Sequence, residues 1–357
     1  MSTNDHEADG LIVSMVQELE QRETDALRLY RPRNEEIDEF HRSAAAERIV
    51  RGGKGSGKSC AGYAELASAA TGIPIVGVDG KPISRGYPEP PLLIWSIGYG
   101  WDHIGDTVYR YLCTEDHGMR MITDEVTGQW RIYRPWEDEH REKESRKMGP
   151  LIPKRMIQMI GWENTRLNQF SIIRLTNGTT IRAFVSTAER AKMGDEPNLI
   201  DVDEDVKYPA HVEEWLSRLR KGGRFTWHAH PWTHNEALRG ISQRAEEQKG
   251  EKEPDVEEFR LKFSENRFIH EKERRKMIRR WSDMGDDILR SNDEGEYMMD
   301  SVMMYPSWSE DVHGISLASP GPNEKNMWIR LLAESLRENN GTPPSNWRRD
   351  LIIDPGH

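Results

Sequence analysis

Residues 47–59 read Glu47-Arg-Ile-Val-Arg-Gly-Gly-Lys-Gly-Ser-Gly-Lys-Ser59, and the alanine-rich run Cys60-Ala-Gly-Tyr-Ala-Glu-Leu66 follows. The first five residues are typical of a short strand and the alanine-rich run of a helix. Between them, Gly52 to Ser59 fits the pattern G-x-x-x-x-G-K-[ST] in full. A strand, a glycine-rich loop and a helix in this order predict a P-loop within an α/β protein.

The P-loop supplies the groups that bind the phosphates of a nucleotide. Backbone N–H groups of the loop and the helix N-terminus point at the β-phosphate, where the helix dipole favours negative charge. Lys58 is expected to reach the β- and γ-phosphates, and the Ser59 hydroxyl to ligate Mg²⁺. The alternative is a flexible glycine loop without a ligand. The expected nucleotide-binding residues are Gly52, Gly53, Lys54, Gly55, Ser56, Gly57, Lys58 and Ser59.

A second apolar run ends in carboxylates. Leu199-Ile-Asp-Val precedes Asp203 and Glu204, although Asp201 interrupts the run. A P-loop enzyme needs a strand that ends in a Mg²⁺-linked carboxylate, and Asp203 is the candidate. Glu204 would polarise the attacking water as general base. A solvated acidic turn is the alternative, but together with the P-loop the pair favours hydrolysis of ATP.

Composition excludes several classes of protein. The chain has 357 residues, which suggests two or three domains; 36% are hydrophobic and 31% charged. No apolar stretch approaches the roughly 20 residues that a membrane span needs. Two cysteines, Cys60 and Cys113, cannot form a disulfide framework and point to a reducing compartment. The polar N-terminus shows no signal-peptide pattern. Secreted, membrane, collagenous and largely disordered proteins are therefore excluded.

The charge balance does not by itself indicate a nucleic-acid binder. The chain has 50 basic and 61 acidic residues, a net charge of −11, whereas nucleic-acid binders are usually basic. Binding would require a local basic surface. Residues 272–280 are one candidate for such a basic surface. This candidate, like the next one, is equally explained as a solvated helix face. A second cluster consists of Arg218, Arg220, Lys221 and Arg224.

Periodicity predicts the remaining elements. Thr176-Asn177-Gly178 between two β-rich runs predicts a hairpin. Residues 115–170 are charge-dense and are interpreted as an irregular insertion with a mobile loop. Helices are expected over 11–30, 34–46, 104–112 and 212–220, and strands over 92–97, 199–202, 225–229 and 258–263.

The order of these motifs resembles the large subunit of tailed-bacteriophage terminases, the motors that pump DNA into a procapsid. His230-Pro231 stands where that family has its coupling motif after a strand. The last residues, Leu351-Ile-Ile-Asp354, resemble the first strand of the family's RNase H-like nuclease. The other similar segments are Tyr30-Arg-Pro32, Phe40-His41-Arg-Ser43, the P-loop, Leu175-Thr-Asn-Gly-Thr-Thr-Ile-Arg182, Gly194, Asp203-Glu204, Ser264-Glu-Asn266, Gly295-Glu296 and Tyr305-Pro-Ser-Trp308.

The resemblance implies a fold, an activity and partners. The fold would be a P-loop NTPase of the RecA-like type with a mostly parallel sheet flanked by helices and a small helical lid. The activity would be hydrolysis of ATP with Mg²⁺, driving double-stranded viral DNA into a procapsid, and Phe40 would contact the nucleotide. The partners would be DNA, the portal of the procapsid and the small terminase subunit. A homo-oligomeric ring on the portal, in the host cytoplasm and without a membrane, is expected.

The resemblance also implies the domain order. Asp354 would belong to a nuclease site that needs further carboxylates. We therefore expect this chain to be the motor domain of a longer protein, and the full-length protein would also cut concatemeric DNA. The expected parts are an N-terminal helical segment with adenine-side contacts (1–46), the ATPase core (47–235), a lid (236–317), a linker (318–350) and the first nuclease strand (351–357).

Three segments depart from the family pattern. The P-loop has Lys54 and Gly55 where the family commonly has an arginine, and no glutamine precedes Phe40. Met193 stands where an arginine often acts on the neighbouring subunit. Arg190 is our first candidate for that catalytic cation and Lys192 the second, while a solvated loop is equally open.

Other interpretations remain open on the sequence alone. One is a helicase-like P-loop ATPase that remodels nucleic acid, and another is a nucleotide-binding structural subunit that does not hydrolyse. His228, His230 and His234 suggest a metal site, but a strand end beside the nucleotide explains them better because no cysteine lies near.

Overall fold

The structure is a computed structural model that describes residues 22–83, 86–191, 194–231 and 235–297. Several expected features lie outside these residues: the first part of the 11–30 helix, Lys192, His234, the linker and Asp354. In the described residues, no helix has the length and apolar character needed to cross a membrane.

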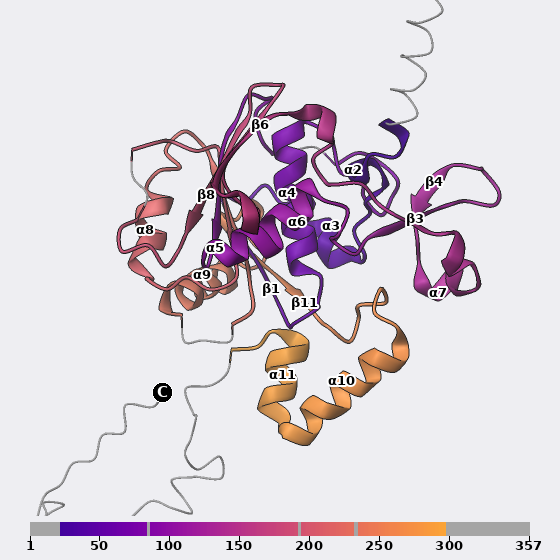
Figure 1. The fold of residues 1–357 in the computed structure, drawn as a ribbon. Helices are drawn as coiled ribbons and strands as arrows, with labels where there is room; N and C mark the ends of the chain where they lie inside the picture. The colour runs from indigo at the N-terminus through magenta and orange to yellow at the C-terminus, as the bar shows by residue number, and fades with distance from the viewer. Residues whose placement is uncertain (1–21, 84–85, 192–193, 232–234, 298–357) are drawn as a thin grey trace, which may run out of the picture. The chain divides into compact units, whose positions relative to one another are not determined.

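Eight of the described strands form one sheet, in the order β11-β1-β10-β9-β2-β8-β7-β6 (Figure 1). The first six in this order are parallel, and β7 and β6 add antiparallel pairings at one edge. The expected hairpin is the turn between β7 and β8. The strands are β1 (Glu47–Gly52), β2 (Leu93–Gly98), β6 (Ile157–Asn164), β7 (Gln169–Leu175), β8 (Thr180–Val185), β9 (Leu199–Asp203), β10 (Arg224–Ala229) and β11 (Val256–Leu261).

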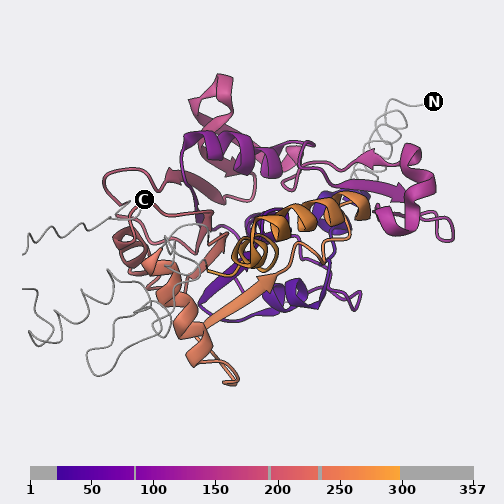
Figure 2. The ribbon, with the colours of Figure 1, turned by 90° about the horizontal axis from the view of Figure 1, so that it is seen from below.

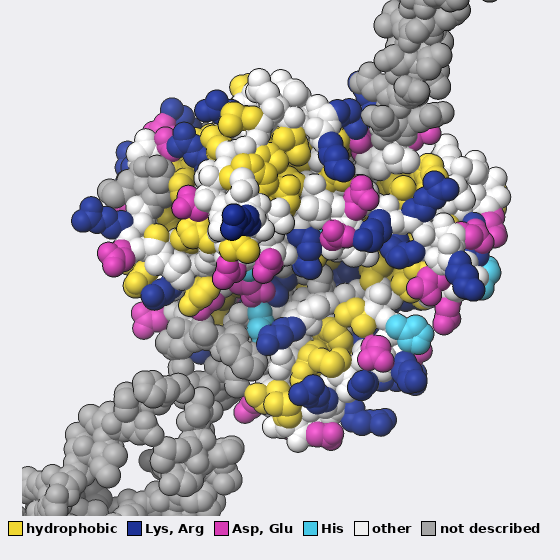
Figure 3. Space-filling view, viewed as in Figure 1, with side chains coloured by type: hydrophobic (Ala, Val, Ile, Leu, Met, Phe, Trp, Pro, Cys, Tyr) yellow, Lys and Arg dark blue, Asp and Glu magenta, His cyan; other side chains and the backbone are white. Residues whose placement is uncertain are grey.

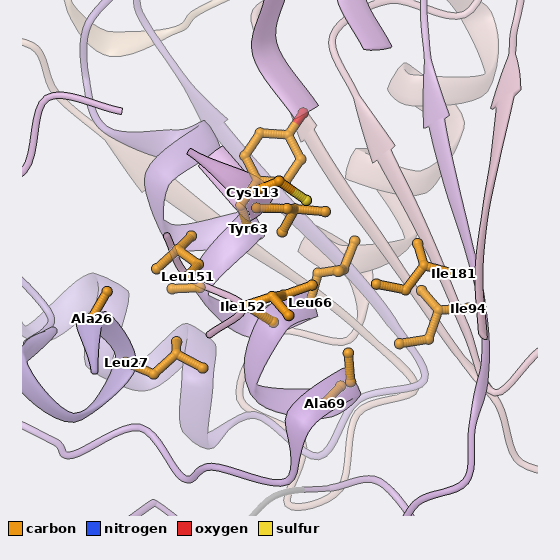
Figure 4. Packing of buried hydrophobic residues seen from close by; sticks show 14 of the residues in the cluster. Ala26, Leu27, Tyr63, Leu66, Ala69, Ile94, Cys113, Leu151, Ile152 and Ile181 are labelled. Atoms are coloured by element: carbon orange, nitrogen blue, oxygen red, sulfur yellow. The ribbon is translucent and has the colours of Figure 1, made fainter. Parts of the chain in front are cut away.

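Helices cover both faces of this sheet. Strand side chains alternate between two apolar clusters, because successive residues of a strand point to opposite faces. Figure 4 shows one cluster, where Leu66 lies near Ile94 and Ile181 of the sheet. On this face lie α2 (Ala26–Leu29), α4 (Lys58–Thr71), α5 (Trp101–His103), the π-helical turn η1 (Ile104–Tyr109) and α6 (Arg110–Cys113). The opposite face carries α8 (Ala210–Leu216) and α9 (Glu236–Glu247).

The protein is therefore an α/β protein of the RecA-like P-loop type. The P-loop strand β1 and the acidic strand β9 are separated by one strand, β10. All three are parallel, so their carboxyl ends meet at one edge of the sheet. Ligands of open α/β sheets bind outside this edge.

A buried ion pair joins the two elements on either side of the P-loop. Arg48 of β1 and Glu65 of α4 lie 2.8 Å apart, and both side chains are almost fully buried. His41, from α3 (Glu35–Arg42), contacts the other Glu65 oxygen at 2.8 Å. Burial alone would raise the pKa of Glu65, but Arg48 and His41 lower this pKa to about 2.

The charged insertion is folded rather than irregular, so that expectation was wrong. Its strands β3 (Arg120–Thr123), β4 (Trp130–Ile132) and β5 (Arg146–Lys147) form a small antiparallel sheet. Arg131 binds Asp124 and Asp138, which explains why so many charges fit a folded unit. The short helices are α7 (Pro135–Asp138), η2 (Glu139–Glu144), η3 (Lys154–Met156) and η4 (Thr165–Leu167).

The lid begins later than expected. Residues 236–261 were assigned to it, but α9 packs on the core and β11 pairs in parallel with β1. We keep the name lid for the segment that follows β11; its helices are α10 (Glu271–Met284) and α11 (Asp286–Glu294), which lie together beyond the end of β11 (Figures 1 and 2). Edge strand β11 exposes charged side chains such as Arg260. In the sequence, this strand therefore resembles the charged segment that follows it, which was expected to form the lid.

Candidate nucleotide site

The P-loop has the backbone that a phosphate site needs. Strand β1 ends at Gly52 and α4 begins at Lys58. Gly57 precedes the helix with φ of 92°, a left-handed conformation that glycine adopts without strain. The first N–H groups of α4 have no partner within the helix and are available to an anion.

Asp203 lies directly against the start of α4. Ser59 Oγ donates a hydrogen bond to Asp203 Oδ1 over 3.2 Å. The structure thus brings together the hydroxyl and the carboxylate that the sequence predicted for Mg²⁺. These hard oxygen donors fit the ion, which proteins usually hold through one or two side chains together with phosphates and water. No cluster of three or more metal-ligating side chains occurs among the described residues.

Three further donors converge on Asp203. His228 Nδ1 lies 2.6 Å from Oδ1, while Tyr63 Oη and His103 Nε2 lie 2.6 and 2.8 Å from Oδ2. Burial would raise the pKa of Asp203, but His228 and His103 outweigh it and hold the pKa well below its usual value. Asp203 is therefore a carboxylate, although it is almost completely buried.

His228 bridges two buried carboxylates. Its Nε2 lies 3.0 Å from Asp201 Oδ1, on the side opposite Asp203. Burial would lower the pKa of His228, but the two carboxylates raise it to about 10. These contacts account for His228 without a metal ion, and they also explain why an aspartate interrupts the apolar run of β9.

Glu204 has an unusual backbone conformation. Its φ is 67°, in the left-handed region that residues with a Cβ rarely adopt. Two hydrogen bonds hold it there: the Glu204 N–H donates to the His228 carbonyl over 3.0 Å, and Trp227 Nε1 donates to the Glu204 carbonyl over 2.6 Å. Such conformations cluster at functional sites, where surrounding contacts maintain them.

This conformation directs the Glu204 side chain to the P-loop. Glu204 Oε1 lies 3.2 Å from Lys58 Nζ. Lys58 is almost fully buried, whereas the Glu204 side chain is 37% exposed. The carboxylate is thus next to the lysine that is expected to bind phosphate, and it is still open to water. His230 is buried at the end of the neighbouring strand β10, where burial and Lys58 lower its pKa to about 4, so that its ring is neutral.

A cavity of about 720 Å³ adjoins these groups. The P-loop, the segment before α3, the small sheet and the start of the lid all contribute to its wall. Phe40, the expected nucleotide contact, does not line it. Phe40 is fully buried against Val50 and Phe259. Ile37, one helical turn earlier in α3, does line the cavity.

The lid touches the P-loop directly. Asn266 Nδ2 donates to the Gly55 carbonyl over 2.7 Å. A Cβ built on Gly53 would lie only 1.7 Å from the Asn292 carbonyl oxygen of α11, so only glycine allows this approach. Sequence reasoning placed Asn266 in the lid but gave no indication of this contact, because 211 residues separate it from Gly55.

The candidate trans-acting residue and most of the candidate basic residues lie on the surface, but Arg224 is buried and donates to the Ser43 carbonyl over 3.0 Å. Arg190 follows β8, is exposed, and forms no ion pair with another described residue; Lys192 and Met193 lie outside the described residues. Helix α10 carries basic and acidic side chains side by side (Figure 3). Arg275 pairs with Glu271, as expected for a solvated face.

Comparisons with known proteins give a likeness in fold. No protein-family model and no curated protein matches the sequence. Among solved structures, the chain is similar to the large terminase ATPase domain of Thermus phage P74-26, with a TM-score of 0.41 and 14% identity over 75% of this chain and 94% of that one. For a point mutant of the same domain, the TM-score is 0.42 and the identity 14%, over 75% of this chain and 95% of that one. Both belong to the family that the motif order resembles. A likeness of this degree says nothing about the reaction.

Sequence reasoning missed several residues of the site. His103, Tyr63 and Asp201 contact Asp203 or its partner His228, and Arg33 lines the cavity beside the P-loop. The only signal in the sequence was the alternation of His228 and His230 on a strand, which placed both near the nucleotide but did not identify their partners.

Proposed function

We propose that the protein hydrolyses ATP at the P-loop. The observation that carries this proposal is the pair formed by Lys58 and Glu204, 3.2 Å apart, with Glu204 held in a left-handed backbone conformation. A solvated acidic turn would need neither the strained backbone nor the buried lysine. A structural nucleotide site would need no carboxylate open to water.

Each side chain of the site would have a different role in the reaction. N–H groups of the P-loop and α4 bind the phosphates, and Lys58 turns from Glu204 to the β- and γ-phosphates. Glu204 is then free to accept a proton from the attacking water. Ser59 and Asp203 would hold Mg²⁺, which supplies charge neutralisation at the transferring phosphoryl group. Tyr63, His103 and His228 fix the Asp203 carboxylate.

Glu204→Gln tests the proposed base. This variant keeps the shape of the side chain and is expected to bind ATP normally while its kcat falls at least ~100-fold, the scale of losing a general base. Lys58→Ala is expected to weaken ATP binding itself. Glu213→Gln, at an exposed position of α8, is the matched control and should keep full activity. Turnover by Glu204→Gln at the wild-type rate would disprove the assignment.

We further propose that hydrolysis drives double-stranded DNA into a viral procapsid. The order of motifs along the chain, from Tyr30 to Asp354, supports this role, and the portal and the small terminase subunit would be the partners. The test is packaging of DNA by the protein with purified procapsids, measured as DNA protected from nuclease. ATPase activity that neither DNA nor procapsids stimulate, without protected DNA, would refute the motor role.

A further inference from the structure

Arg33 is a partly buried cation with unused donors. It lies between α2 and α3 and lines the nucleotide cavity. Its Nη2 donates to the Lys262 carbonyl over 3.1 Å. Its Nε and Nη1 are buried and have no hydrogen-bond partner among the described residues. Burial lowers the pKa of Arg33, and the nearby Glu265 only partly offsets this. Without a ligand, these donors destabilise the folded chain.

The guanidinium adjoins the phosphate-binding end of α4. A Cβ built on Gly57 would lie 3.6 Å from Arg33 Nε. Gly57 directly precedes the helix, so the unused donors lie beside the free N–H groups of its first turn. A guanidinium fork matches the geometry of phosphate oxygens, and bonds from it to phosphate are stronger than neutral ones.

The strand order places Arg33 on the side of the P-loop away from the hydrolytic residues. Its bonding partner Lys262 follows β11, on one side of β1. Asp203 and Glu204 follow β9, which lies two strands from β1 on its other side. Arg33 is therefore next to the phosphates that remain on the product rather than the one that is transferred.

We propose that Arg33 binds the α- and β-phosphates of the nucleotide and so provides the guanidinium that the P-loop lacks at Lys54 and Gly55. This rests on the proposed nucleotide site. Because ATP and ADP share these phosphates, Arg33 contributes equally to binding both. It thereby sets affinity rather than the rate of the chemical step.

The test is to measure the binding of ATP and of ADP to Arg33→Met by isothermal titration calorimetry. For ATP, the titration uses a Glu204→Gln background to prevent turnover. The dissociation constants of both nucleotides are expected to rise by a similar factor, about 10- to 100-fold for a lost charge-assisted contact. In steady state with Glu204 intact, KM rises and kcat changes little. Arg28→Met, at an exposed arginine of α2, is the matched control and should bind as wild type does.

Thermal unfolding separates this role from a structural one. Replacing unsatisfied donors by an apolar group is neutral or stabilising, so Arg33→Met without nucleotide should have a Tm equal to or above that of wild type. If Arg33 only tethers Lys262, the Tm falls and nucleotide affinity at low temperature is retained. Arg33→Lys provides a second variant, which keeps the charge but loses the fork and should show intermediate affinity.

The outcomes distinguish the two proposals. Unchanged ADP affinity in both Arg33 variants overturns the role of Arg33, as does a large fall in kcat with normal ADP affinity. If wild type binds no nucleotide and Lys58→Ala changes nothing, the proposed function itself fails, and the role of Arg33 falls with it.

Discussion

Glu204, the proposed general base, has a strained backbone conformation. At a φ of 67°, a residue with a Cβ is disfavoured by about 1–2 kcal/mol relative to glycine. We compare Glu204→Gly with Glu204→Ala, since both variants lose the contact with Lys58 and differ only in the Cβ. We expect the glycine variant to be the more stable by roughly 1 kcal/mol in denaturant unfolding, although both have lost activity.

The same pair of substitutions at Glu213 is the control. Glu213 is exposed within helix α8, where alanine is favoured over glycine by about 1 kcal/mol. The order of stability should therefore reverse between the two positions. An alanine variant at position 204 that is as stable as its glycine counterpart would contradict the strained conformation.

The buried Glu65 carboxylate predicts a pH dependence of stability. Its pKa is about 2 in the folded chain, below the ordinary value of 4.5. The unfolded chain therefore takes up a proton first as the pH falls, and stability from this group, present above pH 4.5, is lost toward pH 2. The shift corresponds to on the order of 3 kcal/mol. Denaturant unfolding at pH 7 should show Glu65→Gln less stable than wild type, with a difference that shrinks as the pH is lowered below 4.5.

The residues proposed for catalysis follow local sequence patterns, whereas their neighbours do not. Lys58, Ser59, Asp203 and Glu204 follow patterns that phosphate and Mg²⁺ chemistry prescribe, whatever the rest of the chain does. Arg33 has no such pattern, because its role depends on which of its donors tertiary packing leaves unpaired. For the same reason, the burial of Phe40 beneath β11 could not be inferred from its place before the P-loop.

Among the elements, the small sheet contacts the lid beside the nucleotide cavity. Trp136 of α7 meets Phe268 edge to face with ring centroids 5.1 Å apart, and the Arg267 guanidinium lies 4.5 Å from the Trp136 ring. We expect Trp136→Ala to let the cavity open more readily and to raise the ADP dissociation rate constant by about tenfold, since an aromatic pair contributes about 0.5–1.5 kcal/mol beyond its buried area.

Stopped-flow displacement of a fluorescent ADP analogue measures this rate. Trp130→Ala is the control, because Trp130 lies in strand β4 of the same small sheet and contacts Arg146 instead. Equal dissociation rates in the two variants would show that the contact between α7 and the lid does not retain nucleotide.

The elements that the sequence predicted well were those with local patterns. The strand and helix around the P-loop, the β7–β8 hairpin and β9 were all expected near their observed bounds. The small sheet was missed because its strands are short, polar and paired over long distances, as Arg120 is with Lys147. Strand β11 was assigned to the wrong subdomain because its place beside β1 depends on a pairing that no local pattern encodes.

For the whole molecule, the exposed Arg190 predicts that activity depends on assembly. Arginine from a neighbouring subunit can accelerate phosphoryl transfer by 10³–10⁵ where measured. We expect weak ATPase activity in dilute protein and a rate per chain that rises with protein concentration or on portals. Arg190→Ala should remain slow under both conditions.

Mixing two inactive variants gives a stricter test. In a ring containing Arg190→Ala and Glu204→Gln chains, some interfaces pair an intact Glu204 with an intact Arg190, so part of the activity should return. Arg218→Ala mixed with Glu204→Gln serves as the control for simple dilution, because Arg218 pairs with Glu214 of its own chain. A rate per chain that is independent of concentration, with a fully active Arg190→Ala, would remove the trans-acting residue.

The contact between Gly53 and the Asn292 carbonyl has a consequence for how such a chain tolerates variation. A library selected only for resistance to proteolysis, with no nucleotide and no assay of turnover, should still reject alanine at position 53, because a Cβ there would meet a backbone oxygen. Position 53 is one that the phosphate-loop pattern leaves open, so this glycine of the loop is required by folding rather than by the pattern. A chain that had lost its enzymatic activity altogether would keep that glycine, and its presence alone would not reveal the loss.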